Sequence, residues 1–219
     1  MSQPLIIDYY SDLLCVWAWI AQKRLDELNQ KLGDKIEIHY HFVNVFGDTQ
    51  TKMSNQWASK GGYEGFSRHV IESAKPYLHA PVSNEIWSAV KPTTSANAHL
   101  ILKAVEFHYG KAKGVDTALI LRKAFFVNAI DISDFNSLYS LLESSDIDLK
   151  KIKSSISDGK AMAALMSDYQ SAQQLALKGS PTYVIDNGRQ TLYGNVGYRV
   201  LLANIEEQLK RPTDEASWC

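Results

Sequence analysis

The N-terminal part of the chain alternates between short apolar runs and one stretch of helical periodicity. Residues 5–10, Leu-Ile-Ile-Asp-Tyr-Tyr, form an apolar and aromatic run that predicts a strand. Apolar residues then recur at helical spacing over residues 21–32, and Gly33 favours the end of that helix. In residues 35–42 apolar and polar positions alternate, which is typical of a strand. This order predicts two parallel strands joined by a right-handed crossover.

The middle of the chain, from about residue 47 to residue 177, carries helical signals and no convincing strand. Apolar periodicity predicts separate helices within residues 95–107 and 119–126, and a last one that follows Asp158-Gly159. Residues favoured as helix N-caps lie between these runs. The candidate caps are Ser95, Asp131 or Ser133, and Asp146 or Asp148.

Strand signals return near the C-terminus. Residues 182–186 and 189–193 flank Asn187-Gly188, a pair that favours the positive φ angles of a two-residue type I′ turn, so the segment predicts a hairpin. Apolar residues between 201 and 209 then predict a closing helix, which Pro212 ends.

The order of elements is strand, helix, strand, helical block, hairpin and helix. We therefore predict an α/β protein with a thioredoxin-like fold, whose central sheet is assembled from the two ends of the chain. The strand-helix-strand unit and the hairpin-helix unit form the thioredoxin-like domain, in residues 1–50 and 173–219. Residues 51–172 are predicted to be a large all-helical insertion packed near one edge of that core.

Cys15 lies where the first predicted strand has ended and the first helix begins. Unpaired backbone N–H groups and the helix dipole place partial positive charge there, which stabilises a thiolate. Such positions lower a cysteine pKa by roughly one to several units, so Cys15 is predicted to be a reactive nucleophile. The alternative is a small buried core residue, and position alone leaves both open.

The segment Gly179-Ser180-Pro181-Thr182 precedes the third predicted strand. A proline there indicates a rigid turn, and its peptide bond has a cis alternative. In the assembled core this segment is expected beside the start of the first helix. A cis bond would turn the Ser180 backbone toward the thiol, with its N–H and C=O available to an extended peptide or to glutathione.

Together these residues resemble the DsbA family of thioredoxin-fold proteins. That family has a Cys-x-x-Cys motif opening the first helix, a helical insertion after the second strand and a cis-proline before the third. The resemblance covers nearly the whole chain, and residues 10–19 are similar to its cytoplasmic, FrnE-type branch. Further matching segments are residues 96–100, 124–134 and 179–186. The same fold also houses kappa-class glutathione transferases and 2-hydroxychromene-2-carboxylate isomerases, in which a serine generally replaces the first cysteine.

The Cys-Val-Trp-Ala motif at residues 15–18 departs from the family pattern, because Ala18 stands where the second cysteine is expected. A dithiol enzyme uses that cysteine to resolve its mixed disulfide. Three alternatives stay open: Cys15 acts as a monothiol resolved by glutathione, it holds glutathione for transfer or isomerisation, or Cys219 resolves. Cys219 ends a polar tail whose last seven residues reach about 25 Å when extended, although an idle terminal thiol is favoured. Ala18 itself is a candidate substrate contact.

Other residues are candidate contacts for a substrate or for glutathione. In kappa-type proteins a Ser-Asp pair after the fourth strand binds the γ-glutamyl end of glutathione, and the resemblance places Asn195-Val196 there. Asn195 can hydrogen-bond, whereas Val196 cannot accept from an ammonium group. The isomerase branch implies that Asn44 lines the site, although a turn role is favoured. Trp17 is expected to form an exposed aromatic wall, and Trp19 to lie in the core.

Composition and charge reduce the number of possible functions further. The formal net charge of −1 gives no basic footprint for nucleic acid or for an anionic membrane. Two cysteines are too few for a disulfide scaffold, and no secretory signal is apparent, so we expect a cytoplasmic protein. His39 and His41 share one strand face, but no third ligand at suitable spacing is apparent. We therefore expect no metal site and a solvated face.

The sequence supports three hypotheses. The first is a DsbA-type thiol-disulfide oxidoreductase acting through Cys15 on a small thiol or a disulfide-bearing protein, with glutathione as cosubstrate and no tightly bound cofactor. The second is a kappa-type glutathione transferase or a 2-hydroxychromene-2-carboxylate-type isomerase. The third is a non-catalytic thioredoxin-fold binding module or adaptor, which Ala18 keeps open. The sequence leaves the oligomeric state open.

Overall fold

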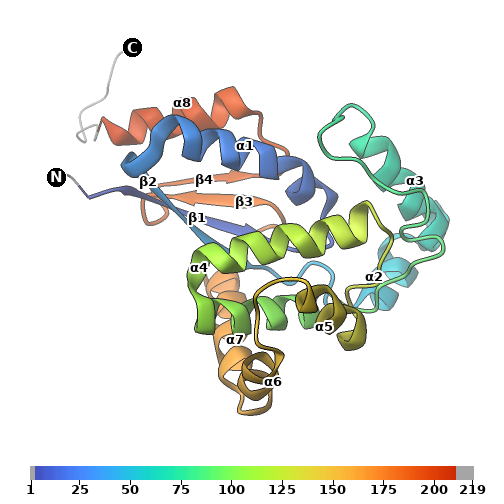
Figure 1. Cartoon of the computed structure of the whole chain (residues 1–219). Helices are drawn as coiled ribbons and strands as arrows, with labels where there is room; N and C mark the ends of the chain where they lie inside the picture. The colour runs from blue at the N-terminus through green and yellow to red at the C-terminus, as the bar shows by residue number, and fades with distance from the viewer. Residues whose placement is uncertain (1–2, 211–219) are drawn as a thin grey trace.

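A four-stranded sheet lies at the centre of the computed structural model, which describes residues 3–210 (Figure 1). The strand order is β2-β1-β3-β4. The strands are β1 (Leu5–Ser11), β2 (Ile36–Phe42), β3 (Thr182–Ile185) and β4 (Gln190–Tyr193). β1 pairs in parallel with β2 and antiparallel with β3, and β3 pairs antiparallel with β4. The two ends of the chain thus build one thioredoxin-like sheet, as predicted.

Period-two alternation along the strands supplies two apolar layers. Helices α1 (Val16–Leu32) and α8 (Tyr198–Leu209) cover one face of the sheet (Figure 1). There Leu25 and Leu28 of α1 and Leu201 of α8 pack with Ile7 and Tyr9 of β1. On the other face, the next residue of β1, Tyr10, packs with Val184 and with Ala172 of α7 (Lys160–Gln174). The sheet is therefore sandwiched between the terminal helices and the last helix of the insertion.

The segment between β2 and β3 is helical, with one isolated bridge between Ile86 and Val90 in these described residues. Besides α7 it contains the helices α2 (Thr49–Gln56), α3 (Gly62–Ala74), α4 (Ala96–Phe126), α5 (Phe135–Glu143) and α6 (Leu149–Ser157). Two short 3-10 helices, Gly33–Lys35 and Ala58–Lys60, complete the described elements. The predicted division at residues 50/51 and 172/173 stays a prediction. Within residues 3–210, no helix is both long and apolar enough to cross a membrane.

The helix caps agree with the sequence only in part. Asp148 caps α6 as expected, through a hydrogen bond from the Lys150 N–H. The expected cap of α5 is wrong, because Asp134 holds that position and accepts from the Ser137 N–H. Ser95 does precede α4, but its side chain makes no cap bond and turns toward the thioredoxin-like core instead.

Gly110 divides α4 into the two helices that the sequence predicted. Its backbone angles, φ 83° and ψ 169°, are far from helical values. Beyond this break the chain turns back, so that Gly114 faces Glu106. A Cβ on Gly114 would lie 2.5 Å from Cγ of Glu106. Ser95 precedes the first half of α4, and Arg122 lies in the second half. Both side chains are buried in the core.

The hairpin between β3 and β4 lies where the sequence predicted it, but four residues rather than two connect the strands, and Asp186 also has a positive φ of 51°. The Arg189 N–H donates to the Asp186 carbonyl over 3.1 Å. Asn187 and Gly188, at the two central positions, have φ angles of 54° and 90°, as a type I′ turn requires. The helix that follows β4 is α8, whereas Pro212, its predicted stop, lies outside the described residues.

Replacement of Gly110 by alanine tests the break in α4. The combination of φ and ψ at Gly110 is essentially closed to residues with a Cβ, so Gly110→Ala is expected to lower the free energy of unfolding by about 2–3 kcal/mol. Gly159→Ala is the matched control, since Gly159 also has open space around it but has left-handed angles, and it should cost only about 1–2 kcal/mol. Urea denaturation measures both, and equal losses would contradict the assigned backbone at Gly110.

Candidate functional site

Cys15 and the Ser180–Pro181 peptide meet at one end of the sheet. Cys15 is the N-cap residue of α1. Pairing of Tyr10 with Thr182 brings the loop after β1 beside the segment that precedes β3. The Ser180–Pro181 bond is cis, and the Cys15 thiol donates a hydrogen bond to the Ser180 carbonyl over 3.2 Å. Two segments 165 residues apart in the sequence therefore form one site.

Burial, rather than the helix terminus, dominates the acidity of the Cys15 thiol. Only 6% of the residue is exposed, and this burial raises its pKa. The Ser180 hydroxyl and the backbone N–H groups of Ala18 and Trp17, in the first turn of α1, act in the opposite direction and lower the pKa, because they can donate to the thiolate. The Asp12 carboxylate raises the pKa further. The predicted lowering of this pKa is therefore wrong, because burial outweighs these donors.

The expected role of Ser180 in substrate binding stays a prediction. Its carbonyl accepts the Cys15 S–H, which uses one of the two lone pairs of that oxygen. Its hydroxyl oxygen accepts a hydrogen bond from the Asp12 N–H over 2.9 Å. Ser180 is 7% exposed, so it locks the two segments together in the resting protein.

Asp12 organises the loop that holds Cys15. Its carboxylate is fully buried and accepts four hydrogen bonds. The donors are the backbone N–H groups of Leu14, Val45 and Phe46 at 2.9, 3.1 and 2.9 Å, and the Ser95 hydroxyl at 2.8 Å. These groups come from the β1–α1 loop, the β2–α2 loop and the start of α4. One carboxylate thus joins the loop that carries Cys15 to the helical insertion.

His99, on α4, completes this buried polar core. Its Nε2 accepts from the Leu13 N–H over 3.2 Å, so Nδ1 carries the proton and donates to the Tyr169 hydroxyl over 2.9 Å. The ring stacks on Phe42 with centroids 4.4 Å apart. Burial lowers the His99 pKa to about 4, a shift that the nearby Asp12 charge opposes and the nearby Arg122 charge favours. His99 is therefore a neutral side chain that holds the loop before Cys15 in place through its hydrogen bond with Leu13.

Lys52, on α2, is a cation near the thiol that the sequence gave no reason to select. Its side chain is half-buried, with Nζ 5.0 Å from the centre of the Phe46 ring and bonded to Gln56. Burial lowers the Lys52 pKa, whereas the negative charges of Asp12 and of the Cys15 thiolate raise it. The Lys52 charge therefore interacts with Asp12 and Cys15, whereas burial has the largest effect on its own pKa.

The remaining residues of the motif pack inward. Ala18, in the second-cysteine position, is fully buried. Trp17 is half-buried against the core of the insertion, so the expected exposed aromatic wall is wrong. Trp19 lies in the core as expected, and its indole N–H donates to the Pro81 carbonyl. Cys219 lies outside the described residues, so its role as a resolving thiol stays a prediction.

Asn44 and Asn195 do not join the Cys15 site in this structure. Asn44 is exposed and lines a groove with α7, and Cys15 is not among the residues that line that groove. Asn195 Oδ1 accepts from Arg24 over 2.7 Å, and its Nδ2 donates to the Tyr77 hydroxyl over 2.8 Å. Val196 packs against the core beneath α8. Asn195 therefore links α1 to the loop before α4.

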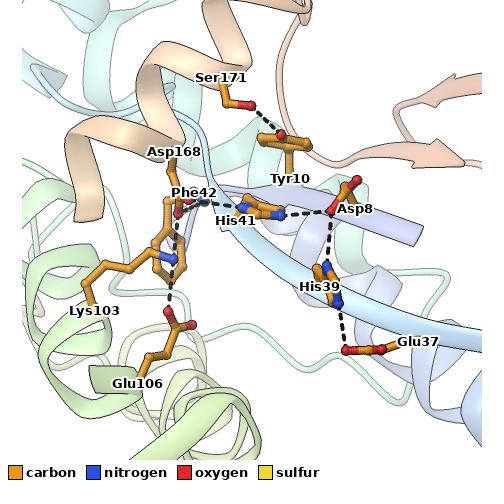
Figure 2. A network of polar contacts seen from close by, with 10 residues as sticks. All are labelled: Asp8, Tyr10, Glu37, His39, His41, Phe42, Lys103, Glu106, Asp168 and Ser171. Atoms are coloured by element: carbon orange, nitrogen blue, oxygen red, sulfur yellow. Dashed lines mark hydrogen bonds and ion pairs between the residues drawn. The ribbon is translucent and has the colours of Figure 1, made fainter. Parts of the chain in front are cut away.

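His39 and His41 belong to a polar network and not to a freely solvated face (Figure 2). The third candidate ligand that spacing did not reveal is Asp8, directly across the parallel ladder from His39. His41 lies between Asp8 and Asp168, each 3.0 Å away. Burial lowers the His41 pKa, but hydrogen bonds and charge from Asp168 and Asp8 outweigh it and raise the pKa to about 9.

The fold and the site define a thioredoxin-fold protein with one cysteine at the start of its first helix. Residues 6–206 match the DSBA-like thioredoxin domain, and the chain belongs to this family. The ClpXP adapter protein SpxH of Halalkalibacterium halodurans is 23% identical over 217 residues, which is 94% of this chain and 68% of that protein.

Two solved structures illustrate the shared fold. The cytosolic disulfide reductase DsbM from Pseudomonas aeruginosa with GSH has a TM-score of 0.70 at 18% identity, covering 94% of this chain and 100% of its own. A 2-hydroxychromene-2-carboxylate isomerase has a TM-score of 0.62 at 17% identity, covering 94% of this chain and 97% of its own. The FrnE-type branch and the cytoplasmic location stay predictions.

Removal of the Asp12 carboxylate tests its structural role. Asp12→Ala leaves three backbone donors and the Ser95 hydroxyl without their acceptor, so we expect a loss of about 3–5 kcal/mol in the free energy of unfolding. Asp48→Ala removes an exposed carboxylate that accepts from a single backbone N–H and should cost far less. Urea denaturation compares the two, and similar losses would refute a special role for Asp12.

The neutral state of His99 predicts a pH dependence of stability. Since the folded pKa of about 4 lies below the unfolded value near 6.5, the unfolded chain binds more protons between these values. Stability is then complete above pH 6.5 and falls by about 3 kcal/mol as pH drops to about 4. Urea denaturation across this range should give a shallower slope for His99→Gln than for the wild type. Parallel slopes would contradict the assignment.

Proposed function

We propose that this protein catalyses thiol-disulfide exchange through Cys15 alone, with glutathione as the second thiol. The observation that carries the proposal is the placement of the Cys15 sulfur at the N-cap of α1, 3.2 Å from the Ser180 carbonyl. The amide groups of Trp17 and Ala18 favour the thiolate at this point. These are the groups that an attacking or departing sulfur needs.

The reaction balances without a second cysteine in the motif. The Cys15 sulfur attacks the glutathione sulfur of a mixed disulfide RS–SG. A Cys15–glutathione S–S bond forms, the RS–SG bond breaks, and the leaving sulfur takes up the proton that Cys15 gives up. A glutathione thiolate then attacks the same glutathione sulfur, which releases glutathione disulfide and restores Cys15. Ala18 leaves this second step to an external thiol.

The burial of Cys15 determines how the exchange reaction begins. With 6% of Cys15 exposed and its proton bonded to Ser180, the resting thiol is protected and mainly protonated. Substrate binding has to open the contact between the α1 loop and the Ser180–Pro181 segment. An incoming strand that bonds to the Ser180 backbone does this, because it competes directly for the carbonyl that holds the thiol.

A second candidate function is a non-catalytic adaptor. Its support is the combination of the buried Ala18, the raised pKa of Cys15 and the name of the relative SpxH, a ClpXP adapter protein. In this alternative Cys15 is a core residue, and partners dock on the outside of the fold. A glutathione transferase or isomerase stays a prediction. Val196 argues against a glutathione transferase, because it occupies a position expected to contact the γ-glutamyl group but packs against the core instead.

Alkylation and exchange of Cys15 distinguish the two candidates. In a Cys219→Ser chain, which has one thiol, we expect slow alkylation at pH 7 that accelerates above pH 9, because burial raises the Cys15 pKa. The same chain should reduce a glutathionylated peptide with glutathione present, and Cys15→Ser should abolish this activity. Mass spectrometry should detect a Cys15–glutathione adduct during turnover.

Three other outcomes would each change the proposed mechanism. Equal exchange rates for the Cys15→Ser chain and the intact chain would overturn the oxidoreductase proposal. A Cys15 that alkylates only after unfolding, with no adduct during turnover, would favour the adaptor. Loss of activity in the Cys219→Ser chain would show that Cys219, and not glutathione, performs the resolving step.

A further inference from the structure

Three side chains with metal-binding atoms converge on the sheet away from Cys15. Asp8 on β1 and His39 on β2 are partners across the parallel ladder, and His41 follows two residues later on the same face of β2 (Figure 2). Their ligand atoms all lie within 4.8 Å of one another. Each side chain is about one-quarter exposed, so an ion and a water molecule can reach them.

Two of the three distances between these atoms are close to those around a small tetrahedral ion. The Asp8 Oδ1 atom is 3.5 Å from His39 Nδ1 and 3.0 Å from His41 Nε2. Bonds of about 2.0–2.1 Å from a tetrahedral zinc ion place two ligand atoms about 3.3–3.4 Å apart. The two distances from Asp8 lie on either side of this value, and the two histidine nitrogens lie within 4.8 Å of each other, so rotations of the side chains are needed to complete the geometry.

The outer ring atoms of both histidines are already oriented by carboxylates. His39 Nε2 is 2.7 Å from Glu37 Oε1, and His41 Nδ1 is 3.0 Å from Asp168 Oδ1. A metal-bound histidine characteristically donates its other N–H to such a carboxylate or carbonyl. Here both histidines do so, and in each case the second ring nitrogen faces the Asp8 carboxylate.

The carboxylate behind His41 is itself firmly held. Asp168 Oδ2 accepts from the Phe42 N–H over 2.9 Å and pairs with Lys103 at 2.7 Å, and Lys103 also pairs with Glu106. The His41 ring stacks on Tyr10 with centroids 4.8 Å apart. The His41 ring therefore has a fixed plane, as a preorganised ligand requires.

We propose that Asp8, His39 and His41 form a binding site for a zinc-type divalent ion, with water as the fourth ligand. Imidazole and carboxylate donors in a tetrahedral set suit Zn²⁺ and exclude a preference for Mg²⁺ or Ca²⁺. The ion takes the place of the proton that His41 Nε2 shares with Asp8. It joins β1 to the edge strand β2, and through Asp168 it strengthens the contact of the sheet with α7.

Titration of Zn²⁺ into the full chain against a chromophoric chelator tests this site. We expect one equivalent to bind, and His39→Gln to weaken binding at least about a hundredfold. Glu37→Gln removes only the orienting carboxylate and should weaken binding about tenfold to a hundredfold. His69→Gln, an exposed histidine on α3, is the matched control and should leave affinity unchanged.

Two further measurements exclude metal binding by the thiols, and unfolding of the variant, as explanations of the result. A Cys15→Ser, Cys219→Ser chain should bind Zn²⁺ as the wild type does. With Co²⁺ it should show the visible bands of a four-coordinate nitrogen and oxygen site, without thiolate charge transfer. Circular dichroism checks that His39→Gln is folded. No stoichiometric binding by the wild type, equal affinity in His39→Gln, or loss of binding in the thiol-free chain would each overturn the proposal.

Discussion

The buried carboxylate of Asp12 is the constraint on which the rest of the site depends. A charge removed from water is tolerated only where donors replace its hydration, and Asp12 finds four of them on three separate segments. Those segments cannot move apart without exposing an unpaired charge. The loop that carries Cys15, the loop after β2 and the first turn of α4 are thus fixed together, and the insertion becomes part of the active-site wall.

This arrangement also explains why Cys15 is a protected thiol. Packing of the loop around Asp12 and the contact with Ser180 exclude water from the sulfur, and burial then outweighs the favourable amide groups of the helix terminus. Reactivity is therefore coupled to opening of the Ser180 contact. Under the proposed monothiol mechanism this protection is useful, because the residue in the second-cysteine position of the motif, Ala18, cannot displace an unwanted adduct.

The second polar network, which adjoins the first at Phe42, uses the same insertion in another way. Asp168 of α7 reaches both the backbone of β2 and the His41 ring, so the last helix of the insertion is tied to the edge of the sheet. The Cys15 site and the Asp8–His39–His41 cluster are thus built from neighbouring strands but face different environments. One excludes water, and the other admits it.

The sequence by itself determined the elements and their order. Apolar periodicity, Gly33, the Asn187-Gly188 turn and the position of Cys15 before a helix are local signals, and each predicted its structure correctly. Only the tertiary structure decided the acidity of Cys15, the partners of Ser95 and Asp12, and the meeting of Asp8 with His39. These properties depend on burial and on contacts between segments far apart in the chain, and no local spacing records either. The physical reason is that solvent exclusion is a property of the assembled packing, whereas helix and strand preference is carried residue by residue.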